Sequence, residues 1–224
     1  MPEHNERRLY ESWNANAEAW TDSVRSSAIA SRRAGTDDAI CAAVRACTPP
    51  PARVLDVGCG EGWLARALGS DGYDVTAFDG SEGLIRAAQA TGGARFVMKT
   101  YDDAIADPDA LGGPFEVIVC NFALLGEHVT PLLRALATTL SHGGCLVIQT
   151  VHPHSDASVA YRDGWREETF DAFGGSYPSA MPWYFHTLES WIDSLIGSGL
   201  TLKRLGELLH PETQRPLSLI LTTG

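Results

Sequence analysis

Short apolar runs alternate with helical patterns through the middle of this chain of 224 residues. Between the apolar runs, leucine and alanine recur at the three- and four-residue spacing of amphipathic helices. The predicted strands are 53–57, 74–78, 95–98, 115–121 and 145–150, and the pattern ends with a helix over 188–196 and strands over 200–205 and 217–222. Strands that alternate with helices are typical of a parallel sheet covered by helices. We therefore predict an α/β fold with a doubly wound, mostly parallel sheet.

Two segments lie outside this alternation. Residues 1–48 are predicted to form two or three helices, in which Trp13 and Trp20 are one heptad apart and so lie on one face. Residues 151–186 are rich in aromatic side chains, and they form a connection far longer than the usual length of about 2 to 6 residues. We predict one domain over residues 1–224, with an N-terminal helical cap (1–48) and an aromatic lid insertion after strand 5 (151–186).

The composition is that of a globular protein, with 44% hydrophobic and 20% charged residues. No apolar run approaches the roughly 18 residues that span a bilayer, and the first residues lack the apolar core of a secretory signal, so we expect a cytoplasmic protein. The net charge of -11, with no local basic stripe, disfavours nucleic acid as a partner. The cysteines form no C-x-x-C pair, so we expect neither a disulfide framework nor a metal cage.

Three glycines stand directly after the first predicted strand, in the stretch VLDVGCGEG. Gly58, Gly60 and Gly62 occupy the first strand-to-helix turn, which lies where ligands bind in a doubly wound sheet. Glycine permits positive φ and close approach of the backbone to a ligand, and the following helix offers free N–H groups. About twenty residues later, Asp79 ends the second strand, where a carboxylate can accept hydrogen bonds from both ribose hydroxyls. These residues predict a nucleotide-like ligand.

The spacing of the glycines favours one class of such ligands. A dinucleotide fingerprint reads GxGxxG, whereas this chain reads GxGxG and has Trp63 in place of the last glycine. Asp56, just ahead of the glycines, would repel a pyrophosphate but suits a ligand with an ammonium group nearby. S-adenosylmethionine carries a ribose, an ammonium and a sulfonium, and it has no phosphate. The turn therefore favours S-adenosylmethionine over NAD.

Two longer stretches around these residues resemble a known family. VLDVGCGEGWLARAL and YDVTAFDGSEGLIRAA resemble the first two motifs of class I S-adenosylmethionine-dependent methyltransferases, and the resemblance covers roughly residues 53–150. It implies a Rossmann-like methyltransferase fold, with S-adenosylmethionine as methyl donor and S-adenosylhomocysteine as product. The cofactor contacts it implies are Asp56, Gly58 and Gly60 for the amino-acid part, Asp79 for the ribose with Gly80 beside it, and Asn121 and Phe122 near the methyl group.

Other cofactor contacts follow from less specific parts of the resemblance. Many members have an acid directly after the third strand, but this chain reads KTYDD, so Tyr101, Asp102 or a backbone group is expected beside adenine. The segment WNANAEAW resembles an N-terminal helix that many small-molecule methyltransferases fold over the cofactor. It predicts Trp20 as a cofactor contact, and the following SRRAGTDDAI predicts Arg33 as a partner of the methionine carboxylate. The alternative is that the tryptophans are core anchors and the arginines are solvated.

Histidines near the predicted ligand edge are the candidates for catalysis. Methyl transfer needs alignment of the acceptor, exclusion of water and, for a hydroxyl or ammonium acceptor, removal of a proton. His152 and His154 lie directly beyond the fifth strand and His186 ends the lid, and each could act as a base near neutral pH. The alternative is that these histidines only cap or hydrogen-bond the lid. No cluster of Cys, Asp or Glu accompanies them, so we predict no metal site.

Two features narrow the nature of the acceptor. The fourth strand is followed by NFALL, whereas nucleic-acid amino-methyltransferases carry a [DN]PP[YF] motif there. An aromatic lid suits a small ring compound such as a phenol or a quinone precursor, and ubiquinone-pathway O-methyltransferases share this general layout. We predict a methyltransferase for a small organic acceptor, such as an aromatic or quinone-like hydroxyl. Two alternatives remain open, namely a protein that binds S-adenosylmethionine without catalysis and, less favoured, a nicotinamide-dependent oxidoreductase.

Overall fold

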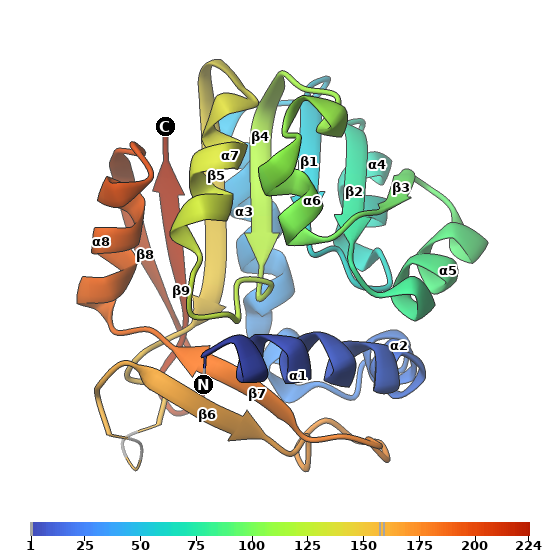
Figure 1. Cartoon of the computed structure of the whole chain (residues 1–224), viewed down its shortest axis with the longest axis vertical. Coiled ribbons are helices and arrows are strands. Elements are labelled where there is room, and N and C mark those ends of the chain that lie inside the picture. Colours follow the sequence, from blue (N-terminus) through green and yellow to red (C-terminus); the bar gives the residue numbers. More distant parts are fainter. Residues whose placement is uncertain (1, 157, 159) are drawn as a thin grey trace.

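The computed structural model describes residues 2–156, 158 and 160–224. Its centre is a seven-stranded sheet with the strand order β3-β2-β1-β4-β5-β9-β8 (Figure 1). The strands are β1 (Arg53–Val57), β2 (Asp74–Asp79), β3 (Arg95–Met98), β4 (Phe115–Asn121), β5 (Leu140–Val151), β8 (Leu202–Leu209) and β9 (Pro216–Thr223). Strands β1 to β5 pair in parallel, and β9 runs antiparallel to both β5 and β8. The predicted α/β fold with a mostly parallel sheet is confirmed.

The order of the strands determines where a ligand can bind. The chain runs outward from β1 through β2 to β3, then returns to place β4 on the other side of β1. A crevice therefore opens at the carboxyl ends of β1 and β4, where the strand order reverses. The bounds of β2, β5, β8 and β9 differ from the prediction, and β5 begins as early as Leu140, where the segment expected to end the preceding helix already pairs with β4.

Helices cover both faces of the sheet (Figure 1). They are α3 (Asp37–Cys47), α4 (Trp63–Ser70), α5 (Glu82–Thr91), α6 (Tyr101–Ala106), the short 3-10 turn η2 (Asp109–Leu111), α7 (Thr130–Thr138) and α8 (Leu188–Gly197). Successive side chains of a strand point to opposite faces of the sheet, so alternate strand residues pack in two separate hydrophobic cores. Leu55 and Ile118 pack with α6, α7 and α8, whereas Val54 and Val117 pack with α3, α4 and α5. Burial on both faces explains the nearly continuous apolar runs.

Side-chain caps fix where the chain leaves the ligand edge of the sheet. Ser81 accepts a hydrogen bond from the N–H of Leu84 and so begins α5, as its position after the second strand predicts. Thr100 and Asp103 form a reciprocal capping box that begins α6. These two caps hold the residues directly after β2 and β3 at the mouth of the crevice.

Two more helices and a hairpin lie across the carboxyl ends of the parallel strands (Figure 1). These elements are α1 (Pro2–Ala15), α2 (Ala17–Arg25), β6 (Gly164–Glu168) and β7 (Met181–Phe185), and we call them together the cover. A π-helical turn, η1 (Arg32–Thr36), leads from the cover into α3. The sequence pattern predicts no strand within 151–186, because GWREE and MPWYF are short and lack a regular alternation of apolar and polar residues.

Candidate functional site

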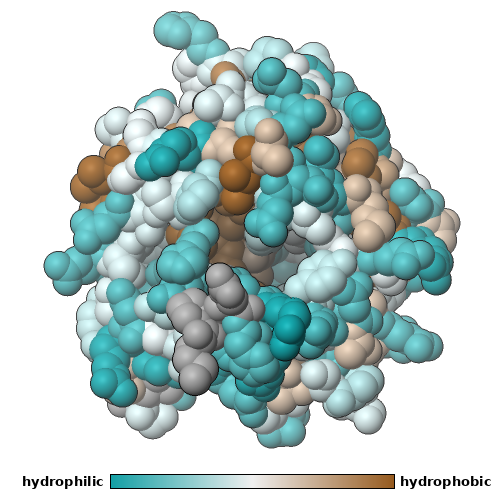
Figure 2. All heavy atoms as spheres, viewed as in Figure 1, coloured by the Kyte–Doolittle hydropathy of each residue, from teal (hydrophilic) through white to brown (hydrophobic). Residues whose placement is uncertain are grey.

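A cavity of about 1380 Å³ lies between the carboxyl ends of the parallel strands and the cover. Figure 2 shows this side of the molecule hollowed near its centre, with apolar residues in the hollow and mostly hydrophilic residues around it. One part of the wall, the sheet end, comes from the turns after the strands: Asp56, Gly58, Gly60, Asp79, Gly80, Tyr101, Asp102, Asn121 and Phe122. The other part, the cover end, is mainly apolar and aromatic: Leu9, Trp13, Phe170, Phe173, Met181, Trp183 and Phe185.

The glycine turn forms the floor of the sheet end. Gly58 and Gly60 have φ of +67° and +58°, a region that side chains rarely enter. A Cβ atom on Gly58 would lie 2.6 Å from the Cβ of Ala123 and 2.6 Å from the hydroxyl of Tyr101. A Cβ atom on Gly60 would lie 3.5 Å from Nε1 of Trp20, which belongs to α2. The turn therefore requires glycine for its conformation and, at Gly58, also for space, and the cover closes directly over it.

Two carboxyl groups lie beside this turn. Asp79 accepts hydrogen bonds from the N–H groups of Gly60 (2.9 Å) and Ser81 (2.8 Å), and burial raises its pKa. Asp56 is 1% exposed, and within the described part of the chain its Oδ2 has no hydrogen-bond partner. Burial, and to a smaller extent the charge of Asp79, raises the pKa of Asp56 to about 7. Because an unpartnered buried carboxyl group is costly, this end suits a ligand that brings hydrogen-bond donors and positive charge.

The remaining predicted residues of the sheet end follow β3 and β4. Tyr101 begins α6 and donates its hydroxyl to the carbonyl of Ala123 (3.0 Å), and burial raises its pKa well above the usual range. Asp102 is its exposed neighbour on the cavity wall. Asn121 ends β4, and its buried Oδ1 has no hydrogen-bond partner among the described residues. Phe122 follows with φ of +51°, an uncommon conformation that marks a sharp exit from the strand.

The arginine of the N-terminal segment that lines the cavity is Arg32, whereas the sequence predicts Arg33 as the partner of the cofactor. Arg33 is exposed, lies outside the cavity wall and donates to the carbonyl of Ser27. Arg32 lines the cavity, pairs with Asp37 at 2.8 Å and lies 4.3 Å from the ring centroid of Trp63. Neighbouring residues of a helical turn do not share a face, and the sequence pattern does not predict which of the two arginines faces the cavity.

Aromatic side chains of the cover pack on one another over the cavity. Trp13 and Trp20 meet edge to face with ring centroids 5.1 Å apart, and Trp20 lies 5.9 Å from Phe173. The two tryptophans therefore serve as packing anchors and as cavity walls at once. Arg166 of β6 also lines the cover end, with its guanidinium carbon 5.4 Å from the ring centroid of Phe185. Its hydrogen bonds go to main-chain carbonyls.

The two histidines after β5 do not line the cavity, contrary to the prediction of a catalytic base there. His152 is 4% exposed, and its Nε2 pairs with Oε1 of Glu207 on β8 at 2.9 Å. Its Nδ1 accepts the N–H of His154 at 3.0 Å. The ring of His154 stacks on Tyr161 with centroids 4.5 Å apart. These contacts match the alternative in which the histidines stabilise the segment after the strand.

His186 also lies outside this cavity. Its Nε2 donates to the carbonyl of Gly126 at 3.0 Å, its Nδ1 lies 3.3 Å from Oγ of Ser190, and burial lowers its pKa. Phe185, one residue earlier, lines the cavity. Because successive strand side chains point to opposite sides, the residue after an inward Phe185 is directed outward.

A histidine of the cavity wall was missed by reasoning from the sequence. Of the histidines in the described ranges, only His128 lines the cavity, and it comes from the loop between β4 and α7. Its position in ALLGEHV could have indicated it, because this stretch follows the fourth strand closely and therefore lies at the ligand edge of the sheet. The side chain is exposed.

Two absences hold over residues 2–156, 158 and 160–224. Within these ranges, no group of three or more His, Cys, Asp and Glu side chains is arranged to hold a metal ion. Over the same ranges, none of the helices combines the length and the apolar character needed to cross a bilayer.

The chain is similar to known methyltransferases. Residues 31–203 match a family model described as a methyltransferase domain. A ubiquinone biosynthesis O-methyltransferase of Xylella fastidiosa (strain 9a5c) is 38% identical over 109 residues, which is 45% of this chain and 42% of that protein. The protein of that name from Xanthomonas campestris pv. campestris (strain B100) is 33% identical over 111 residues, 46% of this chain and 44% of that protein. The chain thus spans less than half the length of the curated relatives that it matches.

Solved structures share the fold over most of the chain. An S-adenosylmethionine dependent methyltransferase from Mesorhizobium loti has a TM-score of 0.62 and 25% identity, with 81% of this chain and 95% of that chain covered. The magnesium protoporphyrin IX methyltransferase from Synechocystis PCC 6803 with bound SAH has a TM-score of 0.59 and 21% identity, with coverage of 86% and 82%. The second likeness concerns the fold alone.

Proposed function

Because the chain belongs to the class I S-adenosylmethionine-dependent methyltransferases, we propose that it transfers a methyl group from S-adenosylmethionine to a small organic acceptor with an aromatic or quinone-like hydroxyl. The observation that carries this proposal is one continuous cavity that includes both the sheet end and the cover end. Its volume of about 1380 Å³ exceeds the roughly 300 to 1,000 Å³ of a site for one ligand. The proposal includes a single domain over residues 1–224 and a cytoplasmic location.

The sheet end would hold the cofactor. Asp79 is oriented by two backbone N–H groups and has room to accept the ribose hydroxyls, as its position at the end of β2 suggests. The unpartnered Oδ2 of Asp56 would accept from the ammonium group. Tyr101 and Asp102 would lie beside adenine, and Trp20 would cover the glycine turn. When bound, S-adenosylmethionine supplies a methyl carbon that its sulfonium already activates.

The cover end would hold the acceptor. Its aromatic walls would align a ring compound and exclude water, which are the main tasks of a protein in methyl transfer. His128 would take the proton from an acceptor hydroxyl, a role that the sequence alone had assigned to other histidines. The curated relatives named as ubiquinone biosynthesis O-methyltransferases support a ring hydroxyl as the acceptor group.

Of the two alternative functions, binding of S-adenosylmethionine without catalysis agrees better with the family match and with the cavity. It would use the same sheet end, and it differs only in turnover. The nicotinamide-dependent oxidoreductase loses its support, because the family match is to methyltransferases and the turn lacks the dinucleotide spacing of glycines.

A methyl-transfer assay tests the proposal. The full chain is incubated with S-adenosylmethionine and one acceptor at a time, from a panel of catechols, hydroxybenzoates and hydroquinones with matched anilines and thiophenols. Mass spectrometry measures S-adenosylhomocysteine and the methylated product. We expect both to form with ring hydroxyls and not with the matched amines and thiols. Binding of S-adenosylhomocysteine without product from any acceptor would favour the non-catalytic alternative.

A further inference from the structure

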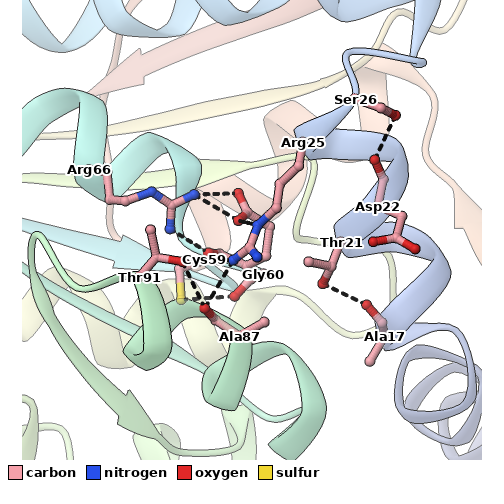
Figure 3. A network of polar contacts seen from close by, with 11 residues as sticks. Ala17, Thr21, Asp22, Arg25, Ser26, Cys59, Gly60, Arg66, Ala87 and Thr91 are labelled. Atoms are coloured by element: carbon pink, nitrogen blue, oxygen red, sulfur yellow. Dashed lines mark hydrogen bonds and ion pairs between the residues drawn. The ribbon is translucent and has the colours of Figure 1, made fainter.

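Glu61 lies buried in the glycine turn, between Gly60 and Gly62, and its side chain is 0% exposed. Arg66 of α4 donates Nη2 to both carboxylate oxygens, at 2.8 and 2.7 Å, and Nη1 to the carbonyl of Glu61 at 2.7 Å. Arg25, the last residue of α2, donates Nε to Oε2 of the same carboxylate at 3.0 Å. Figure 3 shows the side chains of Arg66 and Arg25 reaching toward each other from α4 and α2, and the carboxylate of Glu61 accepts hydrogen bonds from both.

Arg25 holds a third segment as well. Its Nη2 donates to the carbonyl of Ala87 at 3.0 Å and to Oγ1 of Thr91 at 2.8 Å, both on α5 (Figure 3). One guanidinium therefore joins the end of α2 to the glycine turn and to the helix that follows β2. Hydrogen bonds between a guanidinium and a carboxylate are strong and directional, so this contact fixes the position of α2 over the turn.

The N-terminal helices are joined in turn to the hairpin side of the cover. Asn16, 0% exposed between α1 and α2, donates to the carbonyl of Ser179 at 2.7 Å and accepts its N–H at 3.1 Å. Tyr177 donates its hydroxyl to Oγ of Ser23 on α2 at 2.8 Å. The helices α1 and α2 and the segment leading into β7 are thus tied together, and Arg25 is a point where they meet the glycine turn.

We infer that Arg25 is a positioning residue that couples the cofactor's turn to closure of the cover over the acceptor. The inference rests on the proposed function. Through Glu61 and α5, Arg25 holds α2 in the position that places Trp20 above Gly60. The helix α2 is hydrogen-bonded to the segment that precedes β7. Ordering of the glycine turn therefore also stabilises the part of the cover that closes over the acceptor. Binding of the cofactor therefore favours closure of the cover, and by reciprocity a bound acceptor favours binding of the cofactor.

The network is built so that this contact can break and reform. Glu61 keeps both of its carboxylate oxygens bonded to Arg66 when Arg25 departs, so no buried charge is left unpaired. The side chain of Arg25 is 44% exposed and that of Arg66 is 22% exposed. Arg25 can therefore move into water at small cost, whereas Arg66 stays with the turn.

Hydrogen exchange of the full chain, with and without S-adenosylhomocysteine, tests the coupling. The variants are Arg25→Met, Arg25→Lys and the matched control Arg86→Met, whose arginine makes a pair with Glu82 on the surface of α5. In wild type, we expect the ligand to slow exchange in the turn (58–62), in α2 and in the hairpin strands. Arg25→Met should keep the protection of the turn, lose that of α2 and the hairpin, and raise the Kd about tenfold.

The two other variants show whether the forked contact of Arg25 is the cause of the coupling. Arg86→Met should behave as wild type, and Arg25→Lys should be intermediate, because an ammonium keeps the charge but not the forked contact. Equal ligand-induced protection of the hairpin in Arg25→Met and wild type would overturn the inference, even if the melting temperature falls. Wild-type protein that does not bind S-adenosylhomocysteine would overturn the proposed function and the coupling with it. Binding with a cover that responds independently of Arg25 would overturn the coupling alone.

Discussion

The two ends of the cavity are built in opposite ways. The sheet end comes from the turns after β1, β2, β3 and β4, in which glycines, helix caps and backbone hydrogen bonds to Asp79 fix the local conformation. The cover end is assembled from α1, α2 and the hairpin, whose partners Asn16 and Ser179 are 163 residues apart in the chain. The conformation of each turn at the sheet end is therefore determined locally, whereas the cover end depends on contacts between segments far apart in the chain. We expect cofactor affinity and acceptor turnover to respond to different substitutions.

The largest effect is expected at the glycine turn. Gly58→Ala should abolish binding of S-adenosylhomocysteine, with a loss of about 100-fold or more, because the new Cβ meets Ala123 and Tyr101 at 2.6 Å. The control is Gly143→Ala, which has φ of +80° but no atom within 4 Å of the new Cβ. Calorimetric titration of both variants compares a change in the glycine turn with the same kind of backbone strain placed outside the cavity wall. Equal affinities would show that the turn does not form the cofactor floor.

The second-largest effect is expected for His128, the proposed catalytic base. His128→Asn should lower the rate of methyl transfer to a ring hydroxyl by about 100-fold while leaving the affinity for S-adenosylhomocysteine unchanged. His154→Asn is the control, because that ring stacks on Tyr161 away from the cavity. Steady-state kinetics on the same acceptor compares the two variants. A wild-type rate in His128→Asn would remove this residue from the proposed chemistry.

A smaller effect is expected for the aromatic wall. Trp183→Ala should raise the KM of the acceptor about tenfold, because it removes apolar contact area, and it should not change cofactor binding. Trp165→Ala is a matched control on the paired strand, since Trp165 lies outside the cavity wall and donates its Nε1 to Glu127. A loss of cofactor affinity in Trp183→Ala would contradict the division of the cavity into two ends.

The smallest effect is a pH dependence of cofactor binding. The pKa of Asp56 is raised to about 7 in the ligand-free protein, and a nearby ammonium group would lower it. Binding then releases a proton, so affinity should rise a few-fold as pH increases through about 7 and level off above it. In the ligand-free protein, the raised pKa makes stability fall as pH rises from about 4 to about 7.

Calorimetry in buffers of different ionisation enthalpy measures this proton release. Asp56→Asn should bind with no proton released and with little pH dependence over the same range. Proton release that persists in Asp56→Asn would assign the titration to another group.

The contrast between the two ends also explains what could be predicted from the sequence. Strands β1, β3 and β4 have their predicted bounds, and Gly58, Gly60 and Asp79 lie on the cavity wall, because strand periodicity and turn chemistry are encoded over a few residues. Arg33 and His186 lie outside the cavity wall, where the helical turn after the cover and the direction of a hairpin strand place them. Those features depend on contacts with distant segments.

The central claim is that the sheet end binds S-adenosylmethionine, and parallel calorimetric titrations with S-adenosylhomocysteine and NAD test it most directly. We predict that wild type binds S-adenosylhomocysteine with a Kd on the order of micromolar and does not bind NAD. Asp79→Ala should weaken binding by about 1 to 3 kcal/mol, while Asp74→Ala, at the exposed start of the same strand, should not. Binding of NAD alone, or S-adenosylhomocysteine affinity that is unchanged in Asp79→Ala, would contradict the account.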